Sequence, residues 1–365
     1  MQTAIASSPL FLPVMGILAG LVMGYAARRA HFCTMGAFER YWYADDASGL
    51  RTWFLAGATA ILATQSMSFL GWIDVSQSFY LFPRFSLTAA VIGGVVFGIG
   101  MALVGTCGFG ALVRIGGGSL RSLIVVIMIA LSALAIQKGV LSDLRYWLVE
   151  PAAVSLAFSG DQSLPSLAAF YAGEWVRLPL IAAIAGLALA LIFGNAKFRR
   201  SKVRISSGVA IGLTVSAGWL ITSWASRNAF EPVQVESASF VQPLGDVIQM
   251  LIATPFHADY GVGMVFGVLA GSALSAWRAK DMRLEACDDA KELGRHLAGG
   301  FFMGTGGVLA AGCTIGQGVS AMSLLTISAP IVLASIALGA RLGLSYLIEG
   351  SLLAAFSRKS GAAAR

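Results

Sequence analysis

Stretches of about 20 apolar residues recur along this chain, and they restrict its fold more than any other feature because few structures can accommodate them. Hydrophobic residues make up 57% of the 365 residues and charged residues only 12%, about half the usual share in a soluble domain. We therefore predict an all-α polytopic membrane protein. Its nine expected spans lie at about residues 9–28, 53–72, 86–106, 120–138, 177–194, 207–225, 259–277, 297–312 and 326–348.

Basic residues predict how these spans are oriented. Segment 195–206 contains five Lys and Arg residues and no acidic residue, and segment 278–296 is also rich in Lys and Arg. Because loops of this kind stay in the cytoplasm, both segments are predicted to be cytoplasmic. Counting spans from them places the N-terminus outside and the C-terminus inside. The net charge of +7 follows largely from this asymmetry, and no motif supports nucleic-acid binding.

One glycine-rich apolar unit occurs twice, at residues 93–110 and 299–316. Under the predicted orientation the two copies cross the membrane in opposite directions, as in transporters whose substrate site lies where interrupted helices meet. We predict a single domain of residues 1–365 with inverted halves at about 9–138 and 207–348, joined by 139–206. The seven positions shared without gaps are Gly93/Gly299, Gly94/Gly300, Gly98/Gly304, Gly100/Gly306, Leu103/Leu309, Cys107/Cys313 and Gly110/Gly316.

A cysteine stands near the end of each copy, where glycines make a continuous helix unfavourable. Non-helical backbone survives at membrane depth only where protein or a water-filled cavity satisfies it. We interpret both segments as short re-entrant elements lining a path; ordinary loops at helix ends remain the alternative. Cys33 shares the Cys-x-x-Gly spacing of Cys107 and Cys313, whereas Cys287 lies in a charged segment and is expected to have no role.

The cysteines could hold a metal, form a disulfide, pack as structural residues or act in catalysis, and the sequence does not support these roles equally. A metal site is disfavoured because the chain has no Cys-x-x-Cys pair and no histidine at ligand spacing apart from His31 near Cys33. A disulfide between Cys107 and Cys313 and a purely structural role for buried thiols both stay open. A membrane thiol enzyme would need an activating base, and none of His31, His257 and His296 is next to a repeated cysteine.

The strings HFCTMGAF, GTCGFGALVRIGGGSLRSL and AAGCTIGQGVSA resemble signature segments of the YeeE/YedE family of bacterial inner-membrane sulfur-compound transporters, whose best understood members take up thiosulfate. The resemblance covers about residues 9–350. It implies nine helices, inverted pseudo-symmetry, short re-entrant helices, no cofactor, an inner-membrane location and path cysteines at Cys33, Cys107 and Cys313. Thr314, Gln317 and Arg114 are further candidates for the substrate path.

This resemblance suggests a mechanism in which thiosulfate, a dianion with a soft terminal sulfur, passes between neutral thiols. A protonated thiol is a weak donor, whereas a thiolate would repel the substrate. We predict a relay from Cys313 to Cys107 to Cys33, from outside to inside. Another sulfur or selenium anion is an alternative cargo, and a small cytoplasmic TusA-like sulfur carrier is a candidate partner. A non-transporting scaffold, with segment 278–296 as its partner surface, is the remaining alternative.

Overall fold

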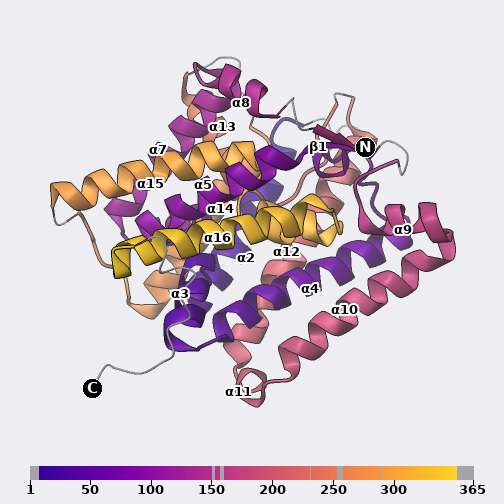
Figure 1. The fold of residues 1–365 in the computed structure, drawn as a ribbon, viewed down its shortest axis with the longest axis horizontal. Helices are drawn as coiled ribbons and strands as arrows, with labels where there is room; N and C mark the ends of the chain where they lie inside the picture. The colour runs from indigo at the N-terminus through magenta and orange to yellow at the C-terminus, as the bar shows by residue number, and fades with distance from the viewer. Residues whose placement is uncertain are drawn as a thin grey trace.

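A computed structural model describes residues 8–149, 153–156, 160–230, 232–252, 258–287 and 289–351. Within these ranges the protein is a bundle of helices with a short antiparallel pair of strands, β1 (Arg84–Ser86) and β2 (Ala153–Ser155) (Figure 1). The helices are α2 (Phe11–Ala30), α3 (Thr34–Ala44), α4 (Ser48–Phe69), η1 (Phe79–Leu81), α5 (Leu87–Val104), α6 (Gly108–Ile115), α7 (Leu120–Lys138), α8 (Ser142–Val149), α9 (Leu164–Ala172), η3 (Glu174–Val176), α10 (Arg177–Phe193), α11 (Ala196–Arg199), α12 (Lys202–Asn228), α13 (Val241–Ile252), α14 (Tyr260–Ala279), α15 (Ala290–Leu309), η4 (Gly316–Ala321) and α16 (Ser328–Glu349).

Seven helical segments in the described part of the chain are long and apolar enough to cross a membrane, so this is a multi-pass membrane protein. They contain α2, α5, α7, α10, α12, α14 and α16, and they coincide with seven of the nine predicted spans. The two other predicted spans fall on α4 and α15, which are helices of 22 and 20 residues but less apolar. That α4 and α15 also cross the membrane stays a prediction.

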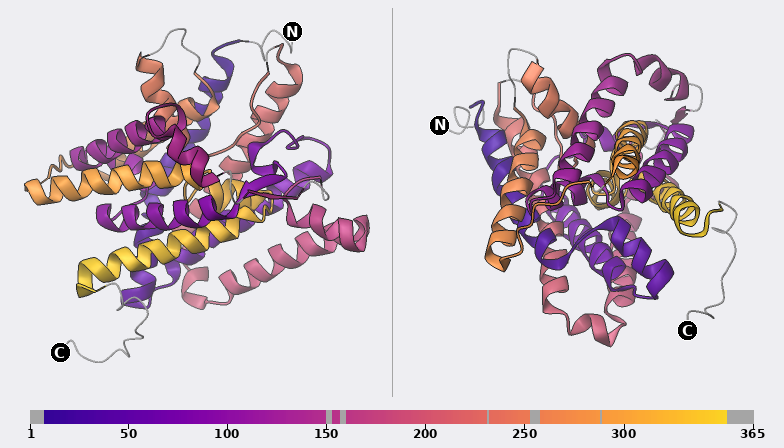
Figure 2. Two further views of the ribbon diagram at one scale, coloured as in Figure 1. Left: turned by 45° about the horizontal axis from the view of Figure 1, so that its top comes forward. Right: turned by 90° about the vertical axis from the view of Figure 1, so that its left-hand side faces the viewer.

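The helices α15, α5 and α16 lie side by side as a layer (Figure 2). Glycines hold them together: a Cβ atom added to Gly93 would lie 2.6 Å from the backbone nitrogen of Ala310, and one added to Gly100 would lie 2.6 Å from the backbone oxygen of Gly299. This pairing shows that α5 and α15 run antiparallel. Small residues permit such contact between backbones, which is how helices associate where lipid removes most of the hydrophobic drive.

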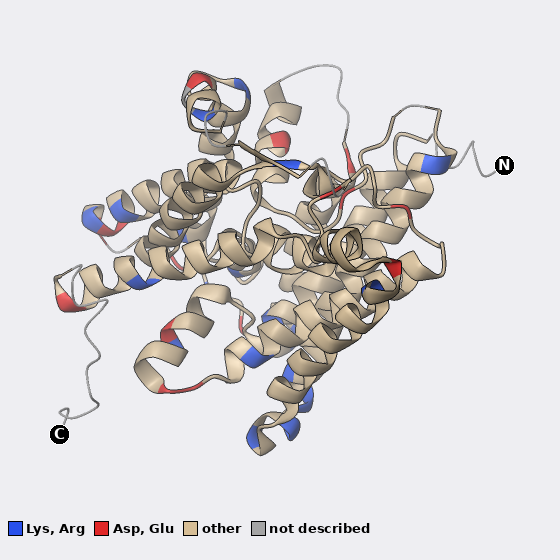
Figure 3. Cartoon of the chain, turned by 45° about the vertical axis from the view of Figure 1, so that its right-hand side comes forward, with Lys and Arg blue, Asp and Glu red and all other residues tan. Residues whose placement is uncertain are grey.

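Helices α2 and α14 form a second close pair, which is parallel. Gly263 meets Pro13 at one end of the contact, and Gly271 meets Leu21 about two turns further along both helices. Helix α12 packs against α2 and α4, and α10 lies at the edge of the bundle beside α4 (Figure 1). Charged residues gather mainly towards the ends of the helices, and few lie in the middle of the bundle (Figure 3).

Both repeated units are interrupted at their cysteine, as predicted, but the break comes just before the cysteine and not in the glycine-rich segment after it. Helix α5 ends at Val104, and Gly105 follows with a φ of 75°. Helix α15 ends at Leu309, and Ala311 and Gly312 follow with φ values of 53° and 152°. A short helix then begins after each cysteine: α6 in the first unit, and the π-helical turn η4 in the second.

Candidate functional site

The two repeated cysteines have the same local geometry. The sulfur of Cys107 accepts a hydrogen bond from the backbone nitrogen of Gly110 at 3.3 Å, and the sulfur of Cys313 accepts one from Gly316 at 3.4 Å. The Cys-x-x-Gly spacing therefore places each thiol at the beginning of a helical turn, as an N-cap residue does. Because the sulfur serves as the acceptor, the thiol hydrogen stays available to donate to another group.

Cys33 completes a row of polar groups across the break in the first unit. A Cβ atom added to Gly110 would lie 3.3 Å from the Cys33 sulfur and 3.5 Å from the Cys107 sulfur, so the two thiols border the same glycine. The Cys33 sulfur also lies 3.5 Å from the hydroxyl oxygen of Thr106. From the second unit, the Thr314 hydroxyl lies close to the Cys107 thiol, without a hydrogen bond of normal geometry between them. The structure thus brings together predicted site residues from three distant segments.

A basic cavity of about 710 Å³, here called the Cys33 vestibule, opens at one end of this row. The Arg114 guanidinium donates to the backbone oxygen of Gly105 at 3.2 Å, which ties it to the break beside Cys107. The Arg40 guanidinium donates to the backbone oxygen of Gly36 at 3.1 Å. The charged side chains lining the vestibule are Arg28, Glu39, Arg40, Arg114, Arg121, Asp281, Arg283 and Glu285, an excess of basic groups.

Two further cavities, here called the Gln317 pockets, have volumes of about 240 and 410 Å³. They share several lining residues, and among the residues that the structure describes neither lining includes an acidic one. Their basic groups are Arg84, Arg145 and Lys138, and the Lys138 ammonium donates to the side-chain oxygen of Gln249 at 2.6 Å. Both cavity systems therefore attract anions.

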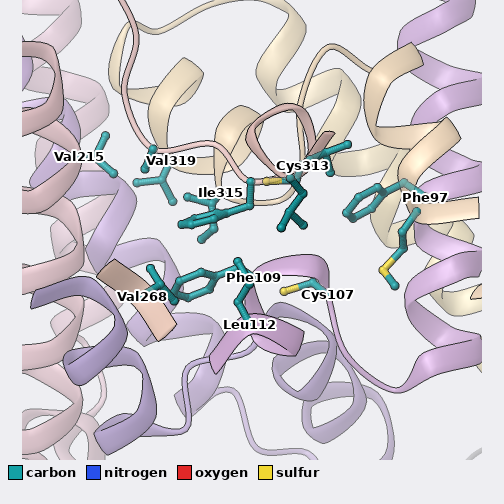
Figure 4. Close-up of a cluster of buried hydrophobic side chains, with 14 of the residues drawn as sticks. Phe97, Cys107, Phe109, Leu112, Val215, Val268, Cys313, Ile315 and Val319 are labelled. Atoms are coloured by element: carbon teal, nitrogen blue, oxygen red, sulfur yellow. The ribbon is translucent and has the colours of Figure 1, made fainter. Parts of the chain in front are cut away.

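The Cys33 vestibule and the Gln317 pockets lie at opposite ends of α5. Ala89 and Ala90 near the start of this 18-residue helix line a Gln317 pocket, and Gly105 just beyond its end lines the vestibule. An α-helix of this length spans about 27 Å. Between the two ends, Cys107 and Cys313 are almost fully buried, with exposed fractions of 0% and 1%, in an apolar cluster (Figure 4). Neither cavity system reaches these two thiols.

Within the described part of the chain, three buried polar atoms beside this closed layer have no hydrogen-bond partner of normal geometry: the Tyr80 hydroxyl, the Thr314 hydroxyl and the Gln317 side-chain oxygen. Each unsatisfied group costs about 1–3 kcal/mol, so their accumulation here indicates a place for water or a ligand. The Gln317 amide nitrogen donates to the backbone oxygens of Ala310 and Ala311, at 3.0 and 3.1 Å. In this conformation Gln317 therefore fixes the break in α15 rather than offering donors to an anion.

Comparison with known proteins identifies the family to which this chain belongs. A sequence model of the sulphur transport family, which is the YeeE/YedE family, matches residues 29–342. The chain belongs to this family. It is 24% identical over 336 residues to the thiosulfate transporter TsuA of Escherichia coli K12, covering 85% of this chain and 88% of that one. It is also 23% identical over 325 residues to the thiosulfate transporter TsuA of Spirochaeta thermophila, covering 86% and 92%.

Membership of the sulphur transport family shows that the chain is a transporter protein and not an enzyme. All four cysteines are free, which leaves the repeated thiols unbridged. Cys287 is partly exposed and does not line the Cys33 vestibule or the Gln317 pockets. Of the histidines, His31 lines the vestibule and His296 is on α15, while His257 falls outside the described residues.

The segment at residues 232–240, here called the strap, contacts the candidate site and was not predicted from the sequence. The Phe240 ring packs against the Phe109 ring with centroids 4.9 Å apart, two residues after Cys107. The Ser320 hydroxyl, on η4, donates to the backbone oxygen of Ala238 at 2.6 Å. The strap therefore contacts both cysteine-bearing segments.

The basic residues that line the Gln317 pockets could have been recognised as site candidates from the sequence. Arg84, Lys138 and Arg145 all lie on the predicted outer side, where the positive-inside rule disfavours Lys and Arg.

The strap also contains Glu236, a partly buried residue. Its side-chain oxygen accepts a hydrogen bond from the backbone nitrogen of Gly261 at 3.2 Å. Burial, followed by repulsion from Asp259, raises the pKa of Glu236 well above its ordinary value. Because the folded pKa is raised, folding is favoured below the ordinary carboxyl range, and stability is lost as pH rises from about 4 towards the raised value.

We expect Glu236→Gln to increase the melting temperature of the purified protein at pH 8, by about 2 °C or more, and to have little effect near pH 4. Glutamine keeps the acceptor for Gly261 and removes the charge. Glu174→Gln is the control, because Glu174 has an exposed side chain paired with Arg177. A Glu236→Gln variant that is less stable than wild type by the same amount at both pH values would contradict this assignment.

Proposed function

We propose that this protein takes up thiosulfate, or a closely related sulfur anion, across the bacterial inner membrane. The observation that carries the proposal is the row of Cys313, Thr314, Cys107 and Cys33 between two basic cavity systems. The names of the two TsuA relatives support the choice of substrate. A transporter needs a site accessible from either side and closed to leakage, and this arrangement meets that requirement.

The chemistry of the buried layer suits a soft dianion. In a medium of low dielectric constant a fixed negative charge would repel thiosulfate strongly, whereas neutral S–H and O–H groups donate weak hydrogen bonds and release the ion easily. The Thr314 hydroxyl has no hydrogen-bond partner of normal geometry, so it is available to a passing anion. In this proposal the anion moves from Cys313 past Thr314 to Cys107 and then to Cys33.

The direction follows from the basic loops. With 195–206 and 278–296 in the cytoplasm, the Cys33 vestibule faces the cytoplasm and the Gln317 pockets face outwards. Arg145 and Lys138 then collect the anion, and Arg114 receives it after Cys33. The antiparallel contact of α5 with α15 and the matching N–H···S geometry at Cys107 and Cys313 support an inverted repeat whose short re-entrant helices, α6 and η4, form the gate.

A small TusA-like sulfur carrier is the proposed cytoplasmic partner. The vestibule includes Asp281, Arg283 and Glu285 from the 278–296 segment, so a protein docked on this segment would receive the anion directly as it leaves. Transport and docking are separate claims, because the row of thiols serves uptake whether or not a carrier is present.

Purified protein in liposomes tests the proposal. We expect saturable entry of radiolabelled thiosulfate, reduced by excess unlabelled thiosulfate and much less by equal concentrations of chloride. Empty liposomes control for leakage. Competition with selenium and other sulfur oxyanions ranks the alternative cargoes, and an imposed pH gradient reports coupling to protons. If the protein is folded and inserted yet no sulfur or selenium anion enters faster than in empty liposomes, the proposed function is wrong and a scaffold role is favoured.

A further inference from the structure

A smaller cavity of about 120 Å³ adjoins the Cys33 vestibule and has no part in the path described above. We call it the side pocket. It is lined by Val104, Arg114, Arg121, Ser122, Glu292, Arg295 and His296. These residues come from the end of α5, from α6, from the start of α7 and from α15. Arg114 and Arg121 line both cavities, so the side pocket and the vestibule share a wall.

The side pocket has more positive than negative charge. Among the described residues its lining contains one carboxylate, that of Glu292, which lies 3.4 Å from the Arg121 guanidinium; this guanidinium also binds Glu285 at 2.7 Å. Arg114 and Arg295 form no ion pair with a carboxylate in the described ranges of the chain. Two guanidinium groups without a counter-charge therefore border a cavity with room for a few water-sized groups. Such groups favour oxyanions, which they bind through paired N–H donors.

Two further groups in the lining suit the same ligand. His296 is 4% exposed, and its Nδ1 lies 2.8 Å from the backbone oxygen of Glu292. A carbonyl oxygen only accepts, so Nδ1 carries a proton, and Nε2 donates to an anionic occupant when the ring carries its second proton. Ser122 lies in the first turn of the 19-residue helix α7, and its hydroxyl is 3.0 Å from that of Ser119. The N-terminus of a helix carries a partial positive charge that attracts anions.

We infer that the side pocket binds a tetrahedral oxyanion of the sulfate or phosphate class, and that the bound anion slows release of substrate by engaging Arg114. Binding at the side pocket stands apart from transport, whereas the effect on release rests on the proposed function. An anion held by Arg295 and His296 draws the Arg114 guanidinium to the side-pocket face of the shared wall. Substrate leaving Cys33 then meets a vestibule with one basic group fewer.

Calorimetric titration of the purified full-length protein with inorganic sulfate, and separately with inorganic phosphate, at constant ionic strength tests the site. We expect Arg295→Gln and His296→Gln each to weaken the favoured anion by about tenfold. Arg40→Gln is the matched control, because Arg40 lines the vestibule and not the side pocket, and it should bind like wild type. Arg295→Lys, which keeps the charge, should recover part of the affinity.

The possible results separate clearly. If Arg40→Gln loses the anion while Arg295→Gln and His296→Gln keep it, the ion binds in the vestibule and the inference is overturned. Absence of saturable binding of either anion by folded wild type also overturns it. In liposomes, sulfate or phosphate on the vestibule side should slow thiosulfate entry in wild type and less in Arg295→Gln. Binding without this inhibition would disprove the effect on substrate release but not the anion site. If the protein transports no thiosulfate at all, the proposed function is wrong, whereas the calorimetric test of the anion site still holds.

Discussion

Replacing Cys107 or Cys313 with alanine is expected to reduce thiosulfate uptake by roughly 10- to 100-fold. A hydrogen bond to a charged group contributes about 1.5–3 kcal/mol, and every 1.4 kcal/mol is a factor of ten in rate or affinity. These thiols are buried in a closed layer where water cannot replace a lost donor. Alanine fills most of the same volume, so the fold is expected to persist while the anion loses a partner in the middle of its path.

Uptake should be measured in liposomes or in cells that depend on this protein for thiosulfate, after checking that each variant is expressed and inserted. Cys287→Ala is the matched control and should transport like wild type, because Cys287 lies away from the path. Cys107→Ser separates two explanations: a hydroxyl still donates, so a donor role predicts partial activity, whereas covalent or redox thiol chemistry predicts none. Alanine variants that transport as well as wild type would refute the relay.

The sequence predicted the helices well because each depends on a local property. Nine apolar stretches were expected, and each coincides with a helix in the structure, although α4 and α15 are less apolar than a typical span. An interruption near Cys107 and Cys313 was also predictable from the glycines around them, although it lies before each cysteine, at Gly105 and Gly312, and not after it. Repetition of the Cys-x-x-Gly spacing directed attention to Cys107 and Cys313, whose part in transport stays a prediction.

The surroundings of those thiols depend on tertiary contacts and were not predictable from local patterns. Tyr80 is on the three-residue helix η1, yet its hydroxyl reaches the break in α15, where it would lie 3.3 Å from a Cβ atom added to Gly312. The strap contacts α6 through Phe240 and η4 through Ala238, in a segment without helical periodicity. In the sequence, Arg295 and His296 belong to a segment that is predicted to be cytoplasmic, and nothing there marks them as a site. Only the contact between α7 and α15 brings them together with Arg121 and Ser122.

We expect the largest loss of stability from a larger side chain at a glycine where two helices are in backbone contact. A Cβ atom added to Gly98 on α5 would lie 2.6 Å from the backbone nitrogen of Ala340 and 2.9 Å from the Cα atom of Gly339, both on α16. Backbone cannot move aside as a flexible side chain can, so a larger residue must push the two helices apart. We expect Gly98→Val to destabilise the protein by more than about 3 kcal/mol, above the usual cost of overpacking.

Gly186→Val is the control, because Gly186 on α10 is exposed and a Cβ atom there would meet no other atom within 4 Å. Both substitutions exchange glycine for valine within a helix, so the difference between them isolates the helix contact. Melting temperature and the yield of monodisperse protein in detergent measure it, and Gly98→Ala should fall between Gly98→Val and wild type. Equal stability of Gly98→Val and Gly186→Val would contradict the packing described here. Because α5 ends three residues before Cys107, separating it from α16 also shifts the buried thiol, so any Gly98→Val protein that folds should transport poorly.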